Sequence, residues 1–199
     1  MSDEAPSEYY PDDRTMIRIG AALAIAFAIG VLVWLLFIRD DDDGALTRSS
    51  SEPAIEAHIV TSGGLADVAA SLGHPVYWAG EHQGEQLELS GTKDGSVYVR
   101  YLTGGAEAGD DRPDFLTVGT YPVEDALGVL RKRGKCSPPR CDRPLRHELP
   151  GGGLLVAEEA NPTSAYLAFP GQNFQIEIFD PRPGQALKLG LSGKILPVR

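Results

Sequence analysis

The chain of 199 residues is poor in basic side chains, in cysteine and in enzyme motifs. Lysine and arginine number 18, against 28 aspartates and glutamates, which gives a net charge of −10. Proteins that bind nucleic acids draw on a basic surface to displace counterions from phosphates. The charge balance therefore argues against a nucleic-acid partner.

Motifs that carry catalysis are also missing. The sequence has no G-x-S-x-G, no H-E-x-x-H, no P-loop and no dinucleotide-binding fingerprint. The glycine-rich PGGGL at 150–154 lacks the following helix with Lys and Ser or Thr that a P-loop needs. Nothing in the sequence places the four histidines in one cleft. We therefore expect no cofactor and no catalytic residue. A binding function is favoured, and the alternative is an enzyme whose site matches no known motif.

One long apolar stretch is present. Residues 17–38, IRIGAALAIAFAIGVLVWLLFI, carry a single charge, Arg18. As a helix these 22 residues would extend about 33 Å, enough for the roughly 30 Å hydrocarbon layer. A cleaved signal peptide would have a shorter apolar region and a small-residue cleavage site, whereas this stretch ends in bulky residues. The pattern predicts an uncleaved transmembrane helix, with the lipid bilayer as partner.

The orientation of this helix follows from weaker signals. Arg14 and Arg18 precede it and Arg39 and Arg48 follow it, so the basic residues do not decide. A short tail before a first span usually stays in the cytoplasm, and a cysteine pair further along suits an oxidising compartment. We expect a single-pass cell-membrane protein with a cytoplasmic N-terminus and an extracytoplasmic C-terminal domain.

The remaining chain divides by composition. Residues 1–16 are acidic and predict a disordered tail, residues 39–54 predict a flexible acidic and serine-rich linker, and residues 55–199 predict the extracytoplasmic domain. Apolar spacings of three and four predict helices in 64–73 and 122–134. Most other segments, including QALKLGLSG at 185–193, look extended. The expected fold class is α+β.

An internal repeat shapes the expected architecture. Shifting the chain by 89 residues aligns 58–104 with 147–193, and 12 of the 47 pairs are identical. The shared pattern is strand, loop, strand, glycine turn, strand. We predict an antiparallel sheet built from two related β-meanders, 75–102 and 164–191, with one or two helices packed on it. Convergence of two similar meanders is the alternative to duplication.

The only cysteines are Cys136 and Cys141, in KCSPPRC. In an extracytoplasmic domain this spacing favours a small disulfide loop. A zinc site with His147 as third ligand is the alternative, but structural zinc normally takes four protein ligands. We expect no metal.

Two groups of residues are candidates for contact with a ligand or partner. Basic side chains gather around the cysteines and could attract an envelope protein, an anionic polymer or lipid headgroups; the alternative is a solvated helix end. The histidine and tryptophan of SLGHPVYWAG, residues 71–80, have no counterpart in the second half of the repeat. The candidates are His74, Trp78, Arg131, Lys132, Arg133, Lys135 and Arg140.

The apolar N-terminal stretch together with LADVAASLGHPVYWAG, DGSVYVRYL, LTVGTYPVEDAL and PTSAYLAFPG resembles uncharacterised single-pass membrane proteins of high-GC Gram-positive bacteria. The resemblance covers about 60–199, and LGHPVYWAG is among its most specific parts. It implies a bacterial cell-surface setting and assigns no functional residue. We expect a membrane-anchored extracytoplasmic domain that binds a protein or another component of the envelope.

Overall fold

The computed structural model describes residues 53–135 and 144–198, and all of these except Asp111–Pro113 belong to one compact unit. The predicted tail, transmembrane helix and most of the linker lie outside the described residues, as do Cys136, Cys141 and Arg140. None of the helices in the two described ranges is long and apolar enough to cross a membrane.

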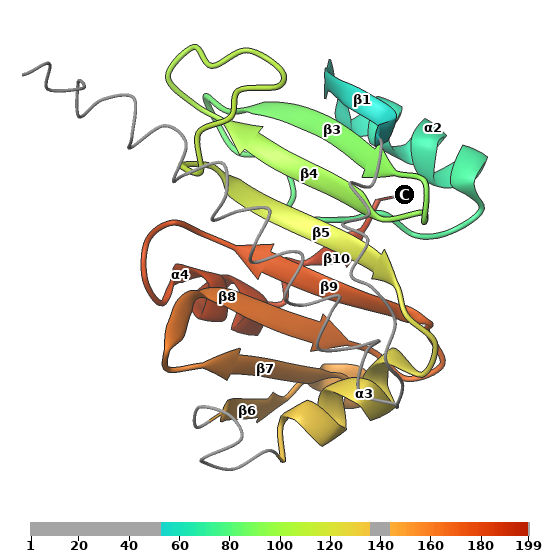
Figure 1. The fold of residues 1–199 in the computed structure, drawn as a ribbon, viewed down its shortest axis with the longest axis vertical. Coiled ribbons are helices and arrows are strands. Elements are labelled where there is room, and N and C mark those ends of the chain that lie inside the picture. The colour runs from blue at the N-terminus through green and yellow to red at the C-terminus, as the bar shows by residue number, and fades with distance from the viewer. Residues whose placement is uncertain (1–52, 136–143, 199) are drawn as a thin grey trace, which may run out of the picture. The chain divides into compact units, whose positions relative to one another are not determined.

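The fold is α+β and is built on one large antiparallel sheet. Its eight strands lie in the order β1-β3-β4-β5-β9-β8-β7-β6 (Figure 1). Their bounds are β1 Pro53–Val60, β3 Gln86–Thr92, β4 Val97–Leu102, β5 Leu116–Pro122, β6 Pro144–Glu148, β7 Leu154–Glu158, β8 Asn161–Ala168 and β9 Phe174–Phe179. A second, two-stranded sheet pairs β2, Tyr77–Trp78, with β10, Leu196–Pro197.

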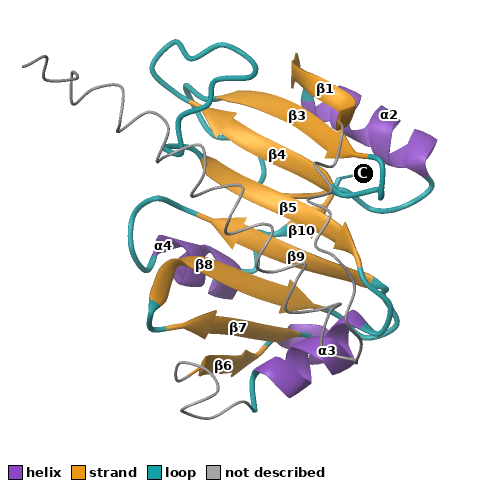
Figure 2. Ribbon diagram, in the orientation of Figure 1, coloured by secondary structure: helices purple, strands orange, loops and turns teal. Residues whose placement is uncertain are grey.

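Three α-helices accompany the sheet in the described residues (Figure 2). Helix α2, Ser62–Leu72, begins after Thr61, whose hydroxyl accepts a hydrogen bond from the Gly64 amide. It ends at Gly73, whose φ of 68° is the left-handed cap that glycine tolerates. Helices α3, Ala126–Arg133, and α4, Gln185–Leu191, are shorter, and a single 3₁₀ turn spans Pro150–Gly152. The two predicted helices, in 64–73 and 122–134, are confirmed.

The main core lies on one face of the large sheet. Alternate residues of the strands point to this face, as the pleat requires. Helix α2 covers it with Leu65, strand β2 with Tyr77, and helix α4 with Ala186. The sheet contributes fully buried aliphatic side chains, including Leu89, Val99, Val118, Leu155, Leu167, Ile176 and Ile178.

Helix α3 packs on the opposite face. A Cβ added at Gly134, where α3 ends, would meet Val156, whereas one added at Gly190 of α4 would meet Leu155. Val156 and Leu155 are consecutive residues of strand β7 and therefore point to opposite faces. The face of the sheet on which α3 packs also carries polar and aromatic side chains from β4, β5, β8 and β9. These side chains form one of the two candidate sites described below.

The predicted pair of meanders is wrong. The shift of 89 residues places β4 on 186–191, but these residues form helix α4 rather than a third strand. The leucines at 187, 189 and 191 alternate, which is why the segment looked extended. Instead Ala186 and Gly190, four residues apart, are buried against the sheet, and Leu191 is 44% exposed. Since three helices pack on the unit, the expectation of one or two is also corrected.

A different repeat is visible in the strand order. Each half of the chain contributes four neighbouring strands to the sheet. From one edge inward these are β1, β3, β4 and β5, and from the other edge inward they are β6, β7, β8 and β9. The two halves meet where β5 pairs with β9. In this order β4 corresponds to β8 and β5 to β9, whereas the sequence shift placed β3 on β9.

Candidate functional site

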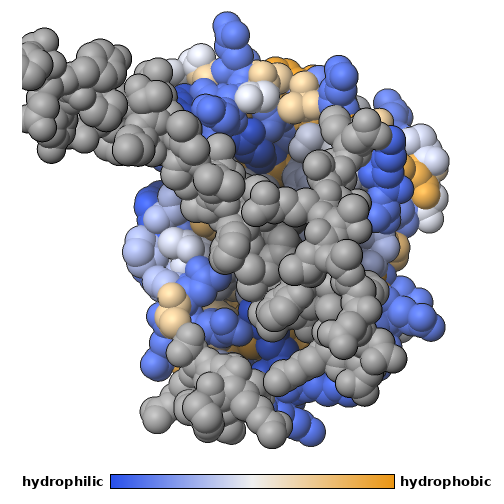
Figure 3. All heavy atoms as spheres, in the orientation of Figure 1, coloured by the Kyte–Doolittle hydropathy of each residue, from blue (hydrophilic) through white to orange (hydrophobic). Residues whose placement is uncertain are grey.

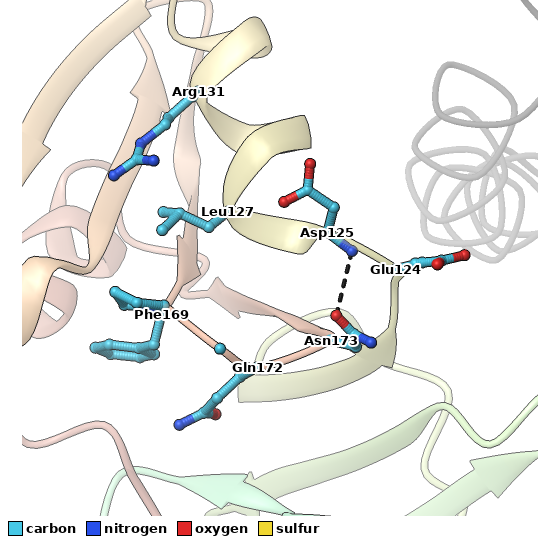
Figure 4. Close-up of a pocket in the computed structure, with 9 residues that line it drawn as sticks. Glu124, Asp125, Leu127, Arg131, Phe169, Gln172 and Asn173 are labelled. Atoms are coloured by element: carbon cyan, nitrogen blue, oxygen red, sulfur yellow. Dashed lines mark hydrogen bonds between the residues drawn. The ribbon is translucent and has the colours of Figure 1, made fainter.

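A hollow of about 370 Å³ lies between the start of helix α3 and the loop that joins β8 to β9. We call it the α3 pocket; Figure 4 shows its two walls. Helix α3 and the residue pair before it provide one wall, and the loop provides the other. The lining residues are Glu124, Asp125, Leu127, Arg131, Phe169, Pro170, Gly171, Gln172 and Asn173. The pocket lining therefore combines acidic and basic side chains, two side-chain amides and several apolar side chains.

The loop and the start of β9 are contacted by Tyr77 and His74. The ring of Tyr77 stacks on Phe169 with centroids 6.2 Å apart, and its hydroxyl donates a hydrogen bond to Gln172 Oε1. The ring of His74 lies 5.1 Å from that of Phe174, where β9 begins. Tyr77 and His74 thus position one wall of the α3 pocket.

The other side of the loop is tied to the start of α3. Asn173 accepts a hydrogen bond from Asp125 N at its side-chain oxygen, 3.3 Å, and one from Val123 N at its carbonyl, 2.9 Å. Asp125 caps the helix by accepting from Gly128 N. Its φ of 47° is left-handed, a conformation that costs a residue other than glycine about 1 kcal/mol or more. Glu124 and Asp125 both line the pocket, and the Asp125 carboxylate is engaged with the helix that it caps.

The predicted basic residues divide into two groups. Arg131 and Lys132 are exposed on α3, Lys135 is exposed just after it, and Arg131 lines the α3 pocket. Arg133 is half-buried and points inward: its Nε donates to Glu158 Oε1 at 2.9 Å, and its guanidinium lies 4.0 Å from the ring centroid of Tyr166. Hydrophilic residues dominate the visible described surface around the sheet in Figure 3.

The two remaining candidates, His74 and Trp78, do not line the α3 pocket. His74 Nδ1 lies 3.0 Å from the Pro75 carbonyl oxygen, while its Nε2 is buried with no hydrogen-bond partner. Trp78 is half-buried, pairs with Leu196 of β10 and packs against the main core. His74 therefore lies against the residue that follows the loop, whereas Trp78 belongs to the packing around the main core.

A second candidate site lies on the face of the sheet that α3 shares. We call it the Glu177 cluster and define it as Tyr98, Tyr121, Tyr166 and Glu177. In the sheet register Glu177 of β9 lies opposite Gly119 of β5 on one side and Tyr166 of β8 on the other. Tyr121 donates its hydroxyl to Glu177 Oε2 at 2.9 Å, and its ring meets that of Tyr98 edge to face at 5.7 Å.

Gly119 is what lets the Tyr121 ring lie over the centre of the sheet. A Cβ at this position would stand 2.8 Å from Tyr121 Cε2 and 2.9 Å from its hydroxyl oxygen. Tyr98 pairs with Gly119 from the other neighbouring strand. Because Gly119 has no side chain, Tyr121 of β5 can contact both Tyr98 of β4 and Glu177 of β9.

The pKa shifts of the cluster reflect burial. Burial raises the pKa of the Glu177 carboxyl, and hydrogen bonds from Tyr121, Ser164 and Tyr166 offset only part of that rise. Burial, with the charges of Asp94 and Glu177, raises the pKa of Tyr98 to about 12. Burial also holds the pKa of Tyr121 well above its ordinary value, with the Glu177 charge adding to the effect. The phenols are neutral donors at physiological pH.

No known protein family, curated protein or solved structure matches the chain. No group of three or more His, Cys, Asp or Glu side chains in the described ranges is placed to hold a metal ion.

Sequence reasoning missed most of both sites. It named only Arg131 of the α3 pocket, although FPGQN between two predicted strands marks a turn that could have been considered. For the Glu177 cluster, the alternation Gln175-Ile176-Glu177-Ile178 places two polar residues on one face of a strand. Gln175 is fully buried, and neither polar atom of its side chain has a partner. A carboxyl and an amide inside an otherwise apolar strand were the available signal.

Proposed function

We propose that the chain is a membrane-anchored extracytoplasmic domain that binds a protein partner through the α3 pocket. The anchor is the apolar stretch 17–38, and the cell-surface setting rests on the resemblance carried by LGHPVYWAG. The observation that supports binding is the α3 pocket itself, an open hollow with charges of both signs, amides and apolar side chains. Such a lining suits a peptide segment, which also offers both charges and apolar groups.

The charge distribution favours a protein over an anionic envelope polymer. Arg131 in the pocket, with Lys132 and Lys135 exposed beside it, would attract either one. Glu124 and Asp125, which line the same pocket, would repel a uniformly anionic polymer but could pair with basic residues of a protein. We therefore place the basic residues at the edge of a protein interface.

The geometry favours binding over catalysis. In an enzyme, the titratable groups whose pKa values are shifted usually lie inside the substrate cleft. In the described residues the hollow lies at the start of α3, whereas the carboxyl with a raised pKa, Glu177, is not among its lining residues.

The test is site-specific photocrosslinking of the full-length chain in its native membrane. A photoreactive side chain at Gln172, in the pocket loop, should give an adduct with one protein; the same group at Glu107, in the loop after β4, should not. The variants Arg131→Glu and Glu124→Lys should each weaken the adduct several-fold. Equal adducts from both positions would remove the proposal. Loss of binding with Arg131→Glu but a gain with Glu124→Lys would indicate an anionic polymer instead.

The membrane setting is tested separately. A reporter fused to the C-terminus should be active only outside the cytoplasm, and the chain should resist extraction by carbonate. Release by carbonate, or a reporter active in the cytoplasm, would contradict the anchor or its orientation.

A further inference from the structure

The Glu177 cluster contains a carboxylate without a cationic partner. In the described residues Glu177 accepts hydrogen bonds from the neutral hydroxyls of Tyr121, Ser164 and Tyr166 and forms no ion pair. The nearby base, Arg133, is already paired with Glu158 at 2.9 Å. The charge of Arg133 also acts on Glu177, but Arg133 is shared with Glu158, so an ionised Glu177 is compensated only in part. A carboxylate that is largely buried among side chains is normally paired with a cation or neutralised.

The groups around Glu177 are aromatic rings. Tyr121 donates to the carboxyl, Tyr166 is its cross-strand neighbour, and Tyr98 lies against Tyr121. The face of an aromatic ring is electron-rich and attracts cations, and combinations of such rings bind ammonium groups. The cluster shows the effect internally, since the guanidinium of Arg133 lies 4.0 Å from the ring centroid of Tyr166.

Parts of the cluster are accessible. Tyr98 and Glu177 are both half-buried and keep some exposed surface, whereas Tyr121 and Tyr166 are only 6% and 4% exposed. The two buried rings are held in place, Tyr121 over Gly119 and Tyr166 under Arg133. The accessible ring and the accessible carboxylate are therefore carried on a rigid base, which lowers the ordering cost of binding.

We propose that the Glu177 cluster is a binding site for a small organic ammonium group, paired with the Glu177 carboxylate and packed on the ring of Tyr98. This site is separate from the α3 pocket, because none of the cluster residues is among the pocket's lining. An ammonium group of this kind occurs in soluble amines and in zwitterionic lipid headgroups. The chemistry that the cluster recognises is the same in both.

The test compares two probes of nearly equal shape on the full-length chain in a nonionic detergent. Choline carries the charge, and 3,3-dimethyl-1-butanol is its neutral isostere. Calorimetric titration should give choline at least about tenfold the affinity of the isostere. Equal affinity, or no saturable binding of choline up to about 20 mM, would overturn the proposal. This comparison needs no variant and does not depend on the stability of any.

Variants then assign the site. Glu177→Gln should weaken choline binding about tenfold and leave the isostere unchanged, and Tyr98→Leu should weaken it several-fold while Tyr98→Phe keeps it within about twofold. Glu124→Gln removes a carboxylate of the α3 pocket and is the matched control. Choline binding that Glu124→Gln weakens and Glu177→Gln does not would overturn the assignment.

The source of the ammonium group is decided by competition. Short-chain phosphatidylethanolamine should displace choline if the cluster accepts headgroups, and short-chain phosphatidylglycerol, which has no ammonium group, should not displace it. Displacement by both lipids would show that the acyl chains bind rather than the headgroup, and would contradict the proposal.

Discussion

A single methyl group at Gly119 should disrupt the centre of the sheet. In Gly119→Ala the new Cβ would stand 2.8 Å from Tyr121 Cε2 and 3.0 Å from Cζ, closer than side chains tolerate. The ring has little space to retreat, because it is 6% exposed and lies against Tyr98. Tyr121 must therefore move away from Glu177 and give up the 2.9 Å hydrogen bond.

The size of the effect follows from the contacts that are lost. A hydrogen bond to a charged or polar partner contributes about 1–3 kcal/mol, and an edge-to-face ring pair about 0.5–1.5 kcal/mol. Alanine regains about 0.5–1 kcal/mol over glycine inside a strand. We expect Gly119→Ala to lower the free energy of unfolding by about 2 kcal/mol, measured by denaturant titration of the full-length chain in detergent.

The same substitution should change sign when the ring is removed. A Tyr121→Ala background removes the three ring atoms nearest to the new Cβ, so Gly119→Ala should be neutral or stabilising by about 0.5–1 kcal/mol. If Gly119→Ala is equally destabilising in both backgrounds, the strain lies in the backbone and not against Tyr121, and the reasoning is refuted.

Three further outcomes follow from other contacts. Because burial raises the pKa of Glu177 above its ordinary 4.5, the protonated form is favoured in the folded state, and stability should fall as the pH rises above 4.5. Glu177→Gln should remove this part of the slope in stability measured against pH. Gly190→Ala would bring a Cβ to 2.4 Å from Leu155 Cδ1 and should cost about 1–3 kcal/mol of unfolding free energy, which Leu155→Ala should partly relieve in a double variant. Arg133→Lys loses the planar group that stacks on a tyrosine ring and should cost about 1 kcal/mol in denaturant titration, whereas Lys132→Arg at the exposed neighbour should be silent.

Each of these has a contradicting result. A pH slope that is the same in Glu177→Gln as in the parent would assign the titration to other carboxyls. A Gly190→Ala variant of unchanged stability would mean that α4 can shift on the sheet without loss. Equal costs for the two basic substitutions would show that the stacking contact adds nothing.

The spacing of apolar residues along the sequence predicts two of the three described helices. Segments 64–73 and 122–134 have apolar residues three and four apart, and both form helices with the capping residues that the sequence supplies. The segment QALKLGLSG, 185–193, has alternating leucines and looks extended in the sequence, but Gln185–Leu191 form a helix. Its helix rests on Ala186 and Gly190, small residues whose value is apparent only when Leu155 and Ile178 of the sheet lie against them.

In the candidate sites, too, the sequence identifies basic residues but not their roles. The basic cluster in the sequence marks Arg131 as a candidate contact residue, and Arg131 lines the α3 pocket. Arg133, from the same cluster, is turned inward to Glu158, which is 25 residues away in the chain. Charge density in a sequence does not distinguish these two roles, since the helix face on which a residue lies decides whether it meets solvent or an acid.

The amino-acid sequence by itself determined the α+β class, two of the three helices in the described residues, and most of the strands, because these depend on periodicity and turn residues within short segments. Only the tertiary structure decided the sheet order, in which β5 pairs with β9 and the two halves of the chain meet. That pairing brings Tyr121 and Glu177, 56 residues apart, to within 2.9 Å. Neighbouring strands can satisfy their backbone hydrogen bonds in many orders, and the choice among them depends on which side chains the whole core can bury together.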